Sequence, residues 1–492
     1  MKTEPTEQTQ DQLSSAADAS NVFDVIIVGG GVTGCAMAAA LATEHRSILV
    51  LEARTKHKPR FAGELLHPTG TQVLDDLGFL PTLRRHGGVD VDGFAVVKSP
   101  GSPVTKLPYS EIAGNRPTGF AMEHRDLVDG MRAWAQKQPG VTFRKSEQVE
   151  SLIRAADGRV CGVTTKTGTF RAKLVLGCDG RHSKMRALLG LSEQARLLSF
   201  SVAMRLPDAA KLLPCPTFGH IFLGAWGPML IYPIGGPSGE KDARGCFDVS
   251  SELSGGPQGA IELLRREYAQ HLPASLAAAL LDSLAKEPPQ IAANEAIRTE
   301  NAVAHGAAIV GDAAGCAHPL TAAGMTVCFT DASRLGTLLS SITDFGDETA
   351  VDAALRQYEI ERYRFVRVRE LLTDALYEVF RGTEPGTRAL REGIFRYWEG
   401  NRAARARSMA LLSGADSRPS VFLREYLSVI GFSTSAALWG ETDRPAKDSS
   451  PLRERIDSLW GLGQKSVEKA HLVFSDVRRE FLRARNVSAP AS

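Results

Sequence analysis

The sequence has few cysteines, and they do not occur in pairs. Seven cysteines are scattered over 492 residues, and no two of them form a CxxC motif. An odd and scattered set of this kind argues against a disulfide framework and against a zinc site. We therefore expect free thiols, no metal centre, and a reducing compartment such as the cytoplasm.

Long hydrophobic runs are also missing. No stretch reaches the roughly 18 or more uninterrupted apolar residues that a membrane-spanning helix needs. The first 21 residues are polar and contain no apolar core of the kind found in secretory signals, so we expect them to form a disordered tail.

Neither charge sign is in marked excess. Lys and Arg number 58, Asp and Glu number 56, and the net charge is +2. Nucleic-acid-binding proteins usually carry a clear basic excess, so this class is disfavoured. Apolar residues make up 43% of the chain and charged residues 23%, as in ordinary globular proteins.

The residues after the polar tail predict an α/β domain. A β-branched run at 23–28 is followed by glycines, an Ala-rich helix at 35–42 and a second apolar strand at 47–51, which together form a βαβ unit. Further strands are expected at 92–98, 141–144, 159–165, 170–177 and 307–311, with others between 196 and 250. Helices are expected at 70–78, 125–137, 258–286, 324–341, 352–380, 387–414, 419–438 and 451–485.

These elements predict an interleaved domain organisation. We expect cofactor-binding parts at 22–190 and 296–345, with a mixed β-sheet substrate domain at 191–295. Residues 80–120 should contribute to the substrate region. Residues 346–492 should form a helical C-terminal region.

The glycines after the first strand form a GxGxxG motif. Gly29 permits a tight turn, Gly31 lets the backbone approach a pyrophosphate, and Gly34 lets the helix pack closely on the strand. Glu52 follows the second strand, where its carboxylate can accept hydrogen bonds from both hydroxyls of a ribose. The motif therefore predicts a dinucleotide with an unphosphorylated adenosine ribose.

Two later elements favour FAD over NAD. A buried strand ends at Gly311-Asp312, where the Asp312 carboxylate could bind a ribityl hydroxyl. The helix that begins at Gly324-Met325 could point its positive end at the flavin O2 edge. Between these elements and the first motif, Asp179 follows another strand in a Cys-Asp-Gly sequence.

With GxGxxG, the central DG and the late GD in this order, the chain resembles the flavoprotein monooxygenases of the aromatic-hydroxylase class over residues 22–345. This resemblance implies a Rossmann-type FAD-binding fold. It also implies that Gly29, Gly31, Gly34, Glu52, Arg125, Asp179, Asp312, Gly324 and Met325 bind FAD.

Two segments are similar to a narrower family, the squalene epoxidases. Residues 59–70, PRFAGELLHPTG, match the pattern R-x-x-G-E-L-L-x-P-x-G, and this adds Arg60 to the implied cofactor-binding residues. Residues 318–327, HPLTAAGMTV, match the family's H-P-L-T-G-G-G-M-T-V, with Ala322 and Ala323 in place of glycines. The segments 375–380 and 410–414 resemble the family's C-terminal helices.

The resemblance implies an FAD-dependent monooxygenase that converts an alkene of a terpenoid or prenyl chain to an epoxide through a flavin C4a-hydroperoxide. The substrate alternatives are a linear triterpene, a prenylated aromatic or quinolone, and a polyketide. The function alternatives are an aromatic or polyketide hydroxylase, an FAD-dependent prenyl reductase or dehydrogenase, and a prenyl-binding escort protein without catalysis.

This chemistry requires no side-chain nucleophile, and we find no convincing catalytic constellation. The weak candidates for proton transfer are His318, His67 and Tyr232. A histidine between small residues and proline, such as His318, is more often structural, and Tyr232 could equally be a packed aromatic of the sheet. Electrons come from NAD(P)H, directly or through a separate reductase. The apolar helix at 419–439 either rests on a membrane surface or packs on the catalytic domain.

Overall fold

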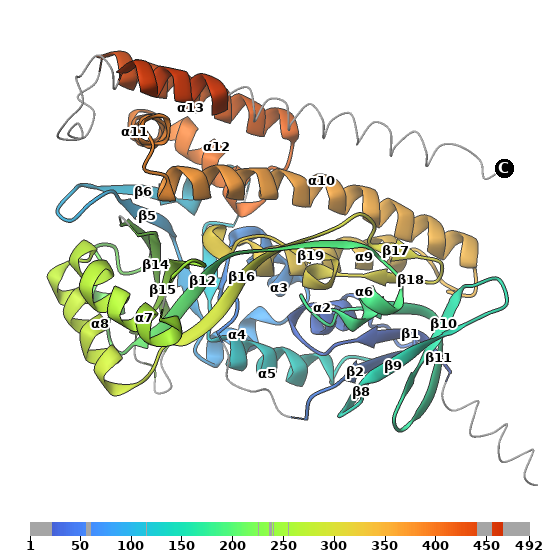
Figure 1. Ribbon diagram of the computed structural model, residues 1–492. Coiled ribbons are helices and arrows are strands. Elements are labelled where there is room, and N and C mark those ends of the chain that lie inside the picture. The colour runs from blue at the N-terminus through green and yellow to red at the C-terminus, as the bar shows by residue number, and fades with distance from the viewer. Residues whose placement is uncertain are drawn as a thin grey trace, which may run out of the picture.

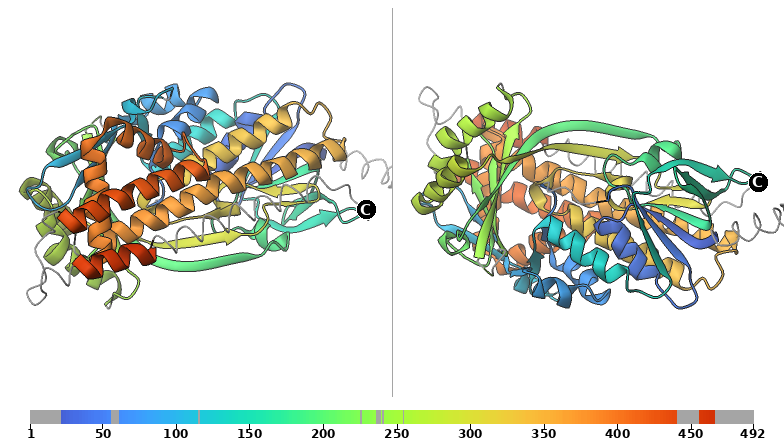
Figure 2. Two further views of the ribbon diagram at one scale, coloured as in Figure 1. Left: turned by 90° about the horizontal axis from the view of Figure 1, so that it is seen from above. Right: turned by 90° about the horizontal axis from the view of Figure 1, so that it is seen from below.

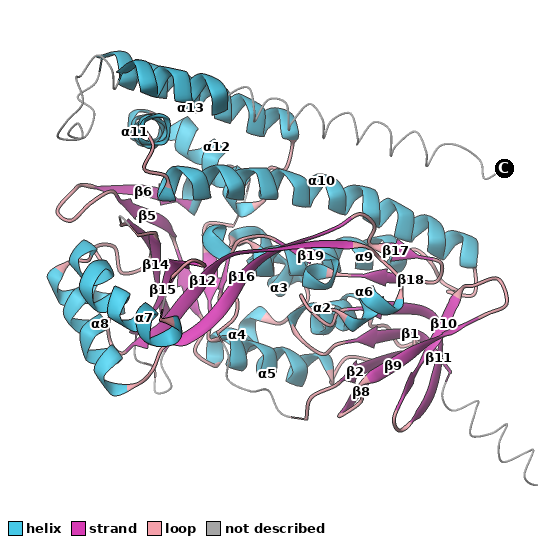
Figure 3. Cartoon of the chain, in the orientation of Figure 1, coloured by secondary structure: helices cyan, strands magenta, loops and turns pink. Residues whose placement is uncertain are grey.

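The computed structural model describes residues 22–55, 61–114, 116–224, 226–235, 239, 241–253, 255–439 and 455–465. Two large β-sheets lie next to each other, and a layer of C-terminal helices crosses above both of them (Figure 1). Figure 3 shows the strands gathered in two groups beneath these helices. The predicted tail at 1–21 lies outside the described residues.

The first sheet contains the βαβ unit that the sequence predicts. Strand β1 (Val22–Val28), helix α2 (Val32–Leu41) and strand β2 (Ile48–Glu52) follow one another, and β1 pairs with β2 in parallel. The order of the sheet is β17-β18-β11-β1-β2-β8, with β10 joining β11 to β9. The other strands are β8 (Val141–Lys145), β9 (Val149–Arg154), β10 (Val160–Thr165), β11 (Gly168–Gly177), β17 (Val303–Ala304) and β18 (Ala307–Ile309).

Parallel pairing brings distant motifs to one edge of this sheet. Strand β1 pairs in parallel with β2 and β11, and β11 pairs in parallel with β18. Their carboxyl ends therefore point the same way, which is where open α/β sheets bind ligands. Gly29, Glu52, Asp179 and Asp312 each lie at or just after one of these ends.

The second sheet is mainly antiparallel, in the order β19-β16-β12-β15-β14-β13-β5-β6. It contains β5 (Gly93–Val97), β6 (Val104–Pro108), β12 (Glu193–Leu206), β13 (Gly219–Leu223), β14 (Pro228–Gly235), β15 (Lys241–Ser250), β16 (Gln290–Thr299) and β19 (Gly315–Cys316). The segment 93–108 thus belongs to this second sheet, and its contribution to a substrate region stays a prediction. Strand β16 extends past residue 295, where we placed the domain boundary. A small third sheet joins β3 (Leu65–Leu66), β7 (Gly119–Ala121) and β4 (Val89–Val91).

Helices fill the space around the sheets. They are α3 (Pro68–Asp76), α4 (Leu80–Arg85), α5 (His124–Ala135), α6 (Lys184–Leu188), α7 (Gly256–Leu263), α8 (Ala274–Lys286) and α9 (Gly324–Ser340). The single helix predicted at 258–286 was wrong. Pro273 lacks the backbone N–H that a helix interior needs, and α8 begins just after it.

The C-terminal region is helical, as expected. It contains α10 (Glu348–Arg381), α11 (Pro385–Gly400), α12 (Arg402–Ser413) and α13 (Pro419–Trp439), with a further helical stretch over 455–465 (Figure 2). The stretch 387–414 is helical, as expected, and is divided into two helices because Asn401 is extended and its side chain accepts hydrogen bonds from Ala403 N and Ala404 N. Most of the predicted helix at 451–485 lies outside the described residues.

The buried apolar side chains form separate clusters. One surrounds the first sheet, and two cover opposite faces of the second sheet. The cluster between the second sheet and α10–α13 joins the C-terminal helices to the substrate side of the molecule. Among the described residues, no helix is both long enough and apolar enough to cross a bilayer.

Candidate functional site: a cavity between the two sheets

A cavity of about 1180 Å³ lies between the carboxyl ends of the first sheet and the second sheet. Its walls include the turns after β1, β2 and β11, strands β14–β16, and the loop that leads into α9. Most small-molecule sites have volumes of about 300–1,000 Å³, so this cavity offers space for more than one drug-sized ligand.

The three glycines of the first motif lie in the conformations that the sequence predicts. Gly29 has φ +104°, and a Cβ there would lie 2.5 Å from the Cys178 carbonyl oxygen. A Cβ on Gly34 would lie 1.8 Å from the Gly29 carbonyl oxygen, so the helix could not pack this closely with any other residue. Gly31 lines the cavity, and no protein atom lies within 4 Å of its Cβ position.

Two helices begin at the cavity without side-chain caps. The residues that precede α2 and α9 are Gly31 and Ala323, which have no side-chain acceptor for the N–H groups of the first helical turn. Their first N–H groups, at the positive ends of the helix dipoles, are therefore available to an anionic or electron-rich ligand. The space beside Gly31 and these two helix starts fit a dinucleotide in this cavity.

Glu52 is held by an arginine that our sequence analysis missed. Arg132 on α5 donates from Nη2 to Glu52 Oε2 at 2.6 Å and from Nε to the Gly30 carbonyl oxygen at 2.6 Å. The backbone N–H groups of Gly30 and Arg54 also donate to the Glu52 carboxylate, at 3.0 and 2.9 Å. Arg132 thus connects the glycine turn to the acid at the end of β2, and both side chains line the cavity.

Asp179 shapes the central turn. Its carboxylate accepts hydrogen bonds from Ser183 Oγ at 2.6 Å and from Met185 N at 3.0 Å. Arg186 on α6 then donates to the Ala313 carbonyl oxygen at 2.8 Å, which links this turn to the late GD element. Asp179 lines the cavity, so cofactor binding by its carboxylate stays a prediction beside this structural task.

A buried ion pair between Asp331 and Arg362 holds the backbone of the late GD element. Gly311 has φ +64° and donates from its N–H to Asp331 Oδ2 at 3.2 Å. Arg362 on α10 donates to the same Asp331 oxygen at 2.8 Å, and both side chains are buried. Helix α10 therefore helps to hold Asp312, the next residue, at the cavity wall.

The two segments that resemble squalene epoxidases meet in space. A Cβ on Gly63 would lie 2.8 Å from Met325 Cγ, and one on Gly70 would lie 3.0 Å from Thr326 Oγ1. The backbone N–H of His67 donates to Thr326 Oγ1 at 3.2 Å. Glycines at these positions let the 61–70 segment lie against the start of α9, and Gly324 and Met325 line the cavity.

Of the two predicted cofactor-binding arginines, Arg125 is described by the structure and does not line the cavity. The Arg125 side chain is 55% exposed and lies 3.9 Å from Asp129, on the same helix. Arg132, about two turns further along α5, lines the cavity, whereas Arg125 does not. Arg60 lies outside the described residues, so its role stays a prediction.

Tyr232 belongs to a buried polar cluster in the cavity wall. Its hydroxyl donates to Glu64 Oε2 at 3.0 Å, and Arg244 donates to both oxygens of the Glu64 carboxylate at 2.8 and 2.9 Å. Burial raises the pKa of Tyr232 well above its ordinary value, so the phenol keeps its proton. Because that proton is bonded to Glu64, Tyr232 is a poor proton donor to a substrate.

The two candidate histidines are fixed in single orientations. His318 Nδ1 accepts a hydrogen bond from Leu320 N at 3.1 Å, so its proton lies on Nε2, 3.1 Å from Asp248 Oδ1. His67 contacts the Thr321 carbonyl oxygen through Nε2 at 2.7 Å and the Tyr109 hydroxyl through Nδ1 at 2.7 Å. Burial lowers the pKa of His67 to about 3, so it is neutral at physiological pH.

The thiols near the cavity offer no nucleophile. All seven cysteines are free, as the sequence predicts. Burial raises the pKa values of Cys246 and Cys316, which line the cavity, to about 12. These thiols therefore stay protonated at neutral pH.

A second cavity of about 90 Å³ lies behind the first, between the second sheet and the C-terminal helices. Its lining is almost entirely apolar and includes Phe94, Val96, Ile221, Leu376, Val379, Phe380, Ile394, Trp398 and Met409. Apolar cavities of this order take up small hydrocarbon groups more readily than water. Among the described residues, Leu320 is the one that lines both cavities.

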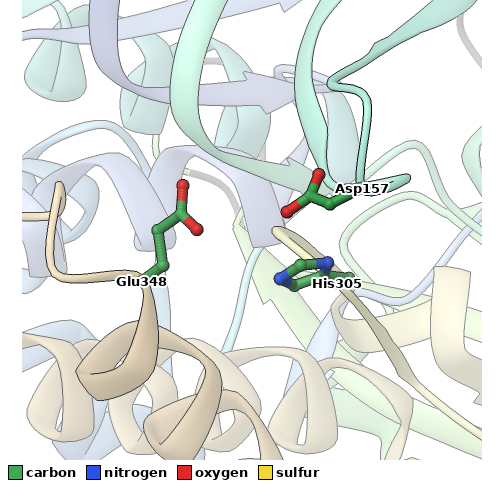
Figure 4. A group of neighbouring side chains, drawn as sticks. All are labelled: Asp157, His305 and Glu348. Carbon is green, nitrogen blue, oxygen red and sulfur yellow. The ribbon is translucent and has the colours of Figure 1, made fainter.

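A separate cluster of potential ligand groups lies on the surface. Asp157, His305 and Glu348 come from three separate segments and have ligand atoms within 4.8 Å of one another (Figure 4). Arg159 lies 3.4 Å from Glu348 and 3.1 Å from Asp352, and His305 lies 3.1 Å from Asp352. The buried guanidinium of Arg159 already neutralises Glu348 and Asp352. We therefore interpret the group as an ion-pair network and not as a metal centre.

Comparison with protein families gives two matches. The family described as "Squalene epoxidase" matches residues 171–444, which is more than half of the chain. The family described as "FAD dependent oxidoreductase" matches residues 24–86, which include the glycine motif and Glu52.

The chain is also similar to curated proteins over most of its length. It is 30% identical to squalene epoxidase erg1 of Aspergillus fumigatus, over 83% of this chain and 85% of that protein. It is also 30% identical to squalene monooxygenase of Mus musculus, over 84% of this chain and 71% of that protein.

Solved structures share the fold. PnpA, a p-nitrophenol 4-monooxygenase from Pseudomonas putida, has a TM-score of 0.67 at 18% identity, covering 81% of this chain and 99% of that chain. PqsL of P. aeruginosa, in complex with 2-aminobenzoylacetate, has a TM-score of 0.64 at 22% identity, covering 74% and 97%. At these identities the likeness concerns the fold alone.

Proposed function

The chain belongs to the squalene epoxidase family, and we propose that it adds one oxygen atom of O2 to a carbon–carbon double bond of squalene or of a similar polyprenyl chain. It is an FAD-dependent monooxygenase, with NAD(P)H as the source of electrons. The non-catalytic escort hypothesis is wrong, because the relatives are enzymes.

The observation that carries the proposal is the junction of two cavities. The larger one is built from dinucleotide-binding elements, and the smaller one is almost purely apolar. They meet at Leu320, four residues before the start of α9. A long hydrocarbon could thus place one double bond in the first cavity and bury another part of its chain in the second.

Several residues would hold FAD in the larger cavity. The turn at Gly29–Gly31 and the first N–H groups of α2 would bind the pyrophosphate. Glu52, fixed by Arg132, would bind the adenosine ribose, and Asp312 would bind the ribityl chain. The start of α9 at Gly324 would face the electron-rich end of the flavin ring. When bound, FAD supplies the oxygen-activating chemistry.

The protein's own task is to position the alkene and to exclude water. Arg244 on β15 is bonded to Glu64, which precedes β3, and this buried contact joins the substrate sheet to the segment beside Met325. Tyr232 fills the same wall. Tyr232 and the cavity thiols keep their protons as described, so none of them acts as a base or a nucleophile at neutral pH.

The route of the electrons has two alternatives. The sequence contains no second GxGxxG motif for a nicotinamide cofactor. NAD(P)H therefore binds transiently, or a separate reductase delivers electrons. Anaerobic flavin reduction by NADPH, measured with and without an added flavoprotein reductase, distinguishes these routes.

The test of the proposed function is product formation. Purified protein with FAD, NADPH, a reductase and squalene should yield a squalene epoxide, detected by gas chromatography with mass spectrometry. The control is Gly34→Ala, which should not retain the cofactor. Formation of a hydroxylated or a saturated product instead would contradict the proposal and favour the hydroxylase or the reductase.

We also propose that the C-terminal helices contact a membrane surface. Helix α13 packs one face on α11, where Gly393 lies against Ser433. Its other face and the 455–465 stretch expose large apolar side chains, namely Leu427, Leu438, Ile456 and Trp460. Apolar faces of this kind can lie in the lipid interface and would let an apolar substrate enter without crossing water.

Liposome flotation tests this membrane contact. The triple variant Leu427→Glu, Leu438→Glu and Trp460→Glu changes only exposed side chains, so FAD content should stay unchanged. We expect the native protein to float with vesicles and the variant to stay at the bottom. If the native protein stays unbound on both neutral and anionic vesicles, the exposed face does not serve membrane binding.

A further inference from the structure

The loop 318–323 forms the partition between the two cavities. Leu320 is 7% exposed and lines both of them. Its neighbours divide between the two sides, because Pro319 lines only the larger cavity and Thr321 only the smaller one. The Leu320 side chain therefore lies where a chain passing from one cavity to the other would have to go.

Two buried histidines hold the backbone that carries this side chain. The Leu320 N–H donates to His318 Nδ1 at 3.1 Å, and His318 Nε2 lies 2.9 Å from Ser199 Oγ and 3.1 Å from Asp248 Oδ1 on the second sheet. On the other side, His67 Nε2 contacts the Thr321 carbonyl oxygen at 2.7 Å. The loop is thus anchored immediately before and immediately after Leu320.

The backbone after Leu320 is also constrained. Ala322 has φ +50°, a left-handed conformation that side-chain-bearing residues rarely adopt. Its N–H donates to the Pro319 carbonyl oxygen at 2.8 Å, and Thr321 Oγ1 lies 3.2 Å from Thr373 Oγ1 on α10. These contacts favour one position of the loop, so the side chain at 320 is held between the two cavities.

We propose that Leu320 is a specificity-determining residue that controls how much of a polyprenyl chain can extend into the apolar cavity, and that His318 and His67 are the residues that position it. The proposal rests on the proposed function, because it requires a chain that spans both cavities. It assigns a structural reason to the two histidines, for which the oxygen-transfer chemistry has no use.

The experiment compares linear polyprenyl alkenes that differ in the number of isoprene units. Leu320→Phe should narrow the passage and lower kcat/KM for the longest chains relative to the shortest by roughly tenfold or more, as expected for a change of a few carbons in an apolar pocket. Leu320→Ala should shift the same ratio in favour of the longest chains. Turnover of the shortest chain by Leu320→Phe shows that this variant is folded and active.

A matched control is Leu230→Ala. Leu230 lines the larger cavity but not the smaller one, so its truncation should change turnover of all chains alike. A constant length ratio in both Leu320 variants, with FAD content unchanged, would overturn the proposal.

The role of His318 is tested by a conservative variant. Asn accepts a backbone hydrogen bond at such a position, so His318→Asn should keep the native length ratio, whereas His318→Ala should shift it as Leu320→Ala does. Equal loss of turnover for every chain in His318→Asn, with FAD retained, would show that His318 serves the chemistry and would overturn its positioning role.

Failure of the proposed function would look different. If the native protein converts none of these alkenes, the epoxidase proposal fails, and the partition can still be tested by binding. Affinities of the same chains are then measured by the change in flavin fluorescence. Relative to the native protein, the longest chains should bind more weakly to Leu320→Phe and more tightly to Leu320→Ala. Affinities independent of chain length and of residue 320 would overturn the inference.

Discussion

Replacing Arg244 with methionine should destabilise the protein strongly. Arg244 makes two hydrogen bonds to Glu64, at 2.8 and 2.9 Å, and the side chains are only 7% and 2% exposed. Removing one partner of a buried pair leaves an uncompensated charge and typically costs about 3–5 kcal/mol. An unfolding entropy of about 2.1 cal/mol/K per residue gives about 1 kcal/mol/K for 492 residues, so the Tm should fall by about 3–5 °C.

The loss of stability in Arg244→Met should become larger as pH rises. Burial raises the pKa of the Glu64 carboxyl group, and Arg244 opposes this shift. Without Arg244, the Glu64 carboxyl group of the folded protein keeps its proton. In the unfolded chain the same group releases its proton above the ordinary Glu pKa of about 4.3. The variant's stability should therefore fall relative to the native protein as pH rises from about 4 towards neutrality.

Scanning calorimetry across this pH range measures both effects. Two variants serve as comparisons. Glu64→Gln combined with Arg244→Met removes both charges and should be more stable than Arg244→Met alone. Arg84→Met breaks an exposed pair with Asp90 and should cost at most about 1 kcal/mol. A Tm for Arg244→Met equal to that of Arg84→Met at neutral pH would refute the reasoning.

Three further outcomes concern the cofactor. Gly34→Ala should purify without FAD, because its Cβ would lie 1.8 Å from the Gly29 carbonyl oxygen, whereas Gly431→Ala on α13, with open space around it, should remain yellow. Asp312→Ala should weaken FAD binding by about 1.5–3 kcal/mol, with partial rescue by excess FAD; unchanged affinity by fluorescence titration would remove Asp312 from the site. Acid precipitation of the native protein should release FAD into the supernatant, and retention of yellow colour in the pellet would indicate a covalent link instead.

The sequence was sufficient to locate the cofactor edge of the first sheet. Each cofactor motif lies at or just after the end of a strand: the glycine motif after β1, Glu52 at the end of β2, and Gly311-Asp312 after β18. The parallel order of β2, β1, β11 and β18 then brings them together without further information. The contact of Gly63 and Gly70 with the start of α9 lies between the two segments that resemble squalene epoxidases. The sequence therefore singled out both sides of this contact.

The charged contacts across the cavity could not be predicted in this way. Arg132 carries a visible signal, since it lies in the buried stripe of α5 with Val128 and Met131, where an apolar residue is expected. Its partner is not readable, because Glu52 is 80 residues away in sequence. Arg244 and Glu64 are 180 residues apart, and only the docking of the two sheets shows that they pair.

The most direct test of oxygen transfer is a single turnover in labelled oxygen. FAD-loaded protein is reduced anaerobically with dithionite, mixed with squalene and exposed to 18O2, so that no reductase is needed. The account predicts an epoxide that carries one 18O atom, in an amount limited by the bound flavin, as measured by mass spectrometry. Flavin reoxidation that yields only hydrogen peroxide, or a product whose oxygen comes from water, would contradict it.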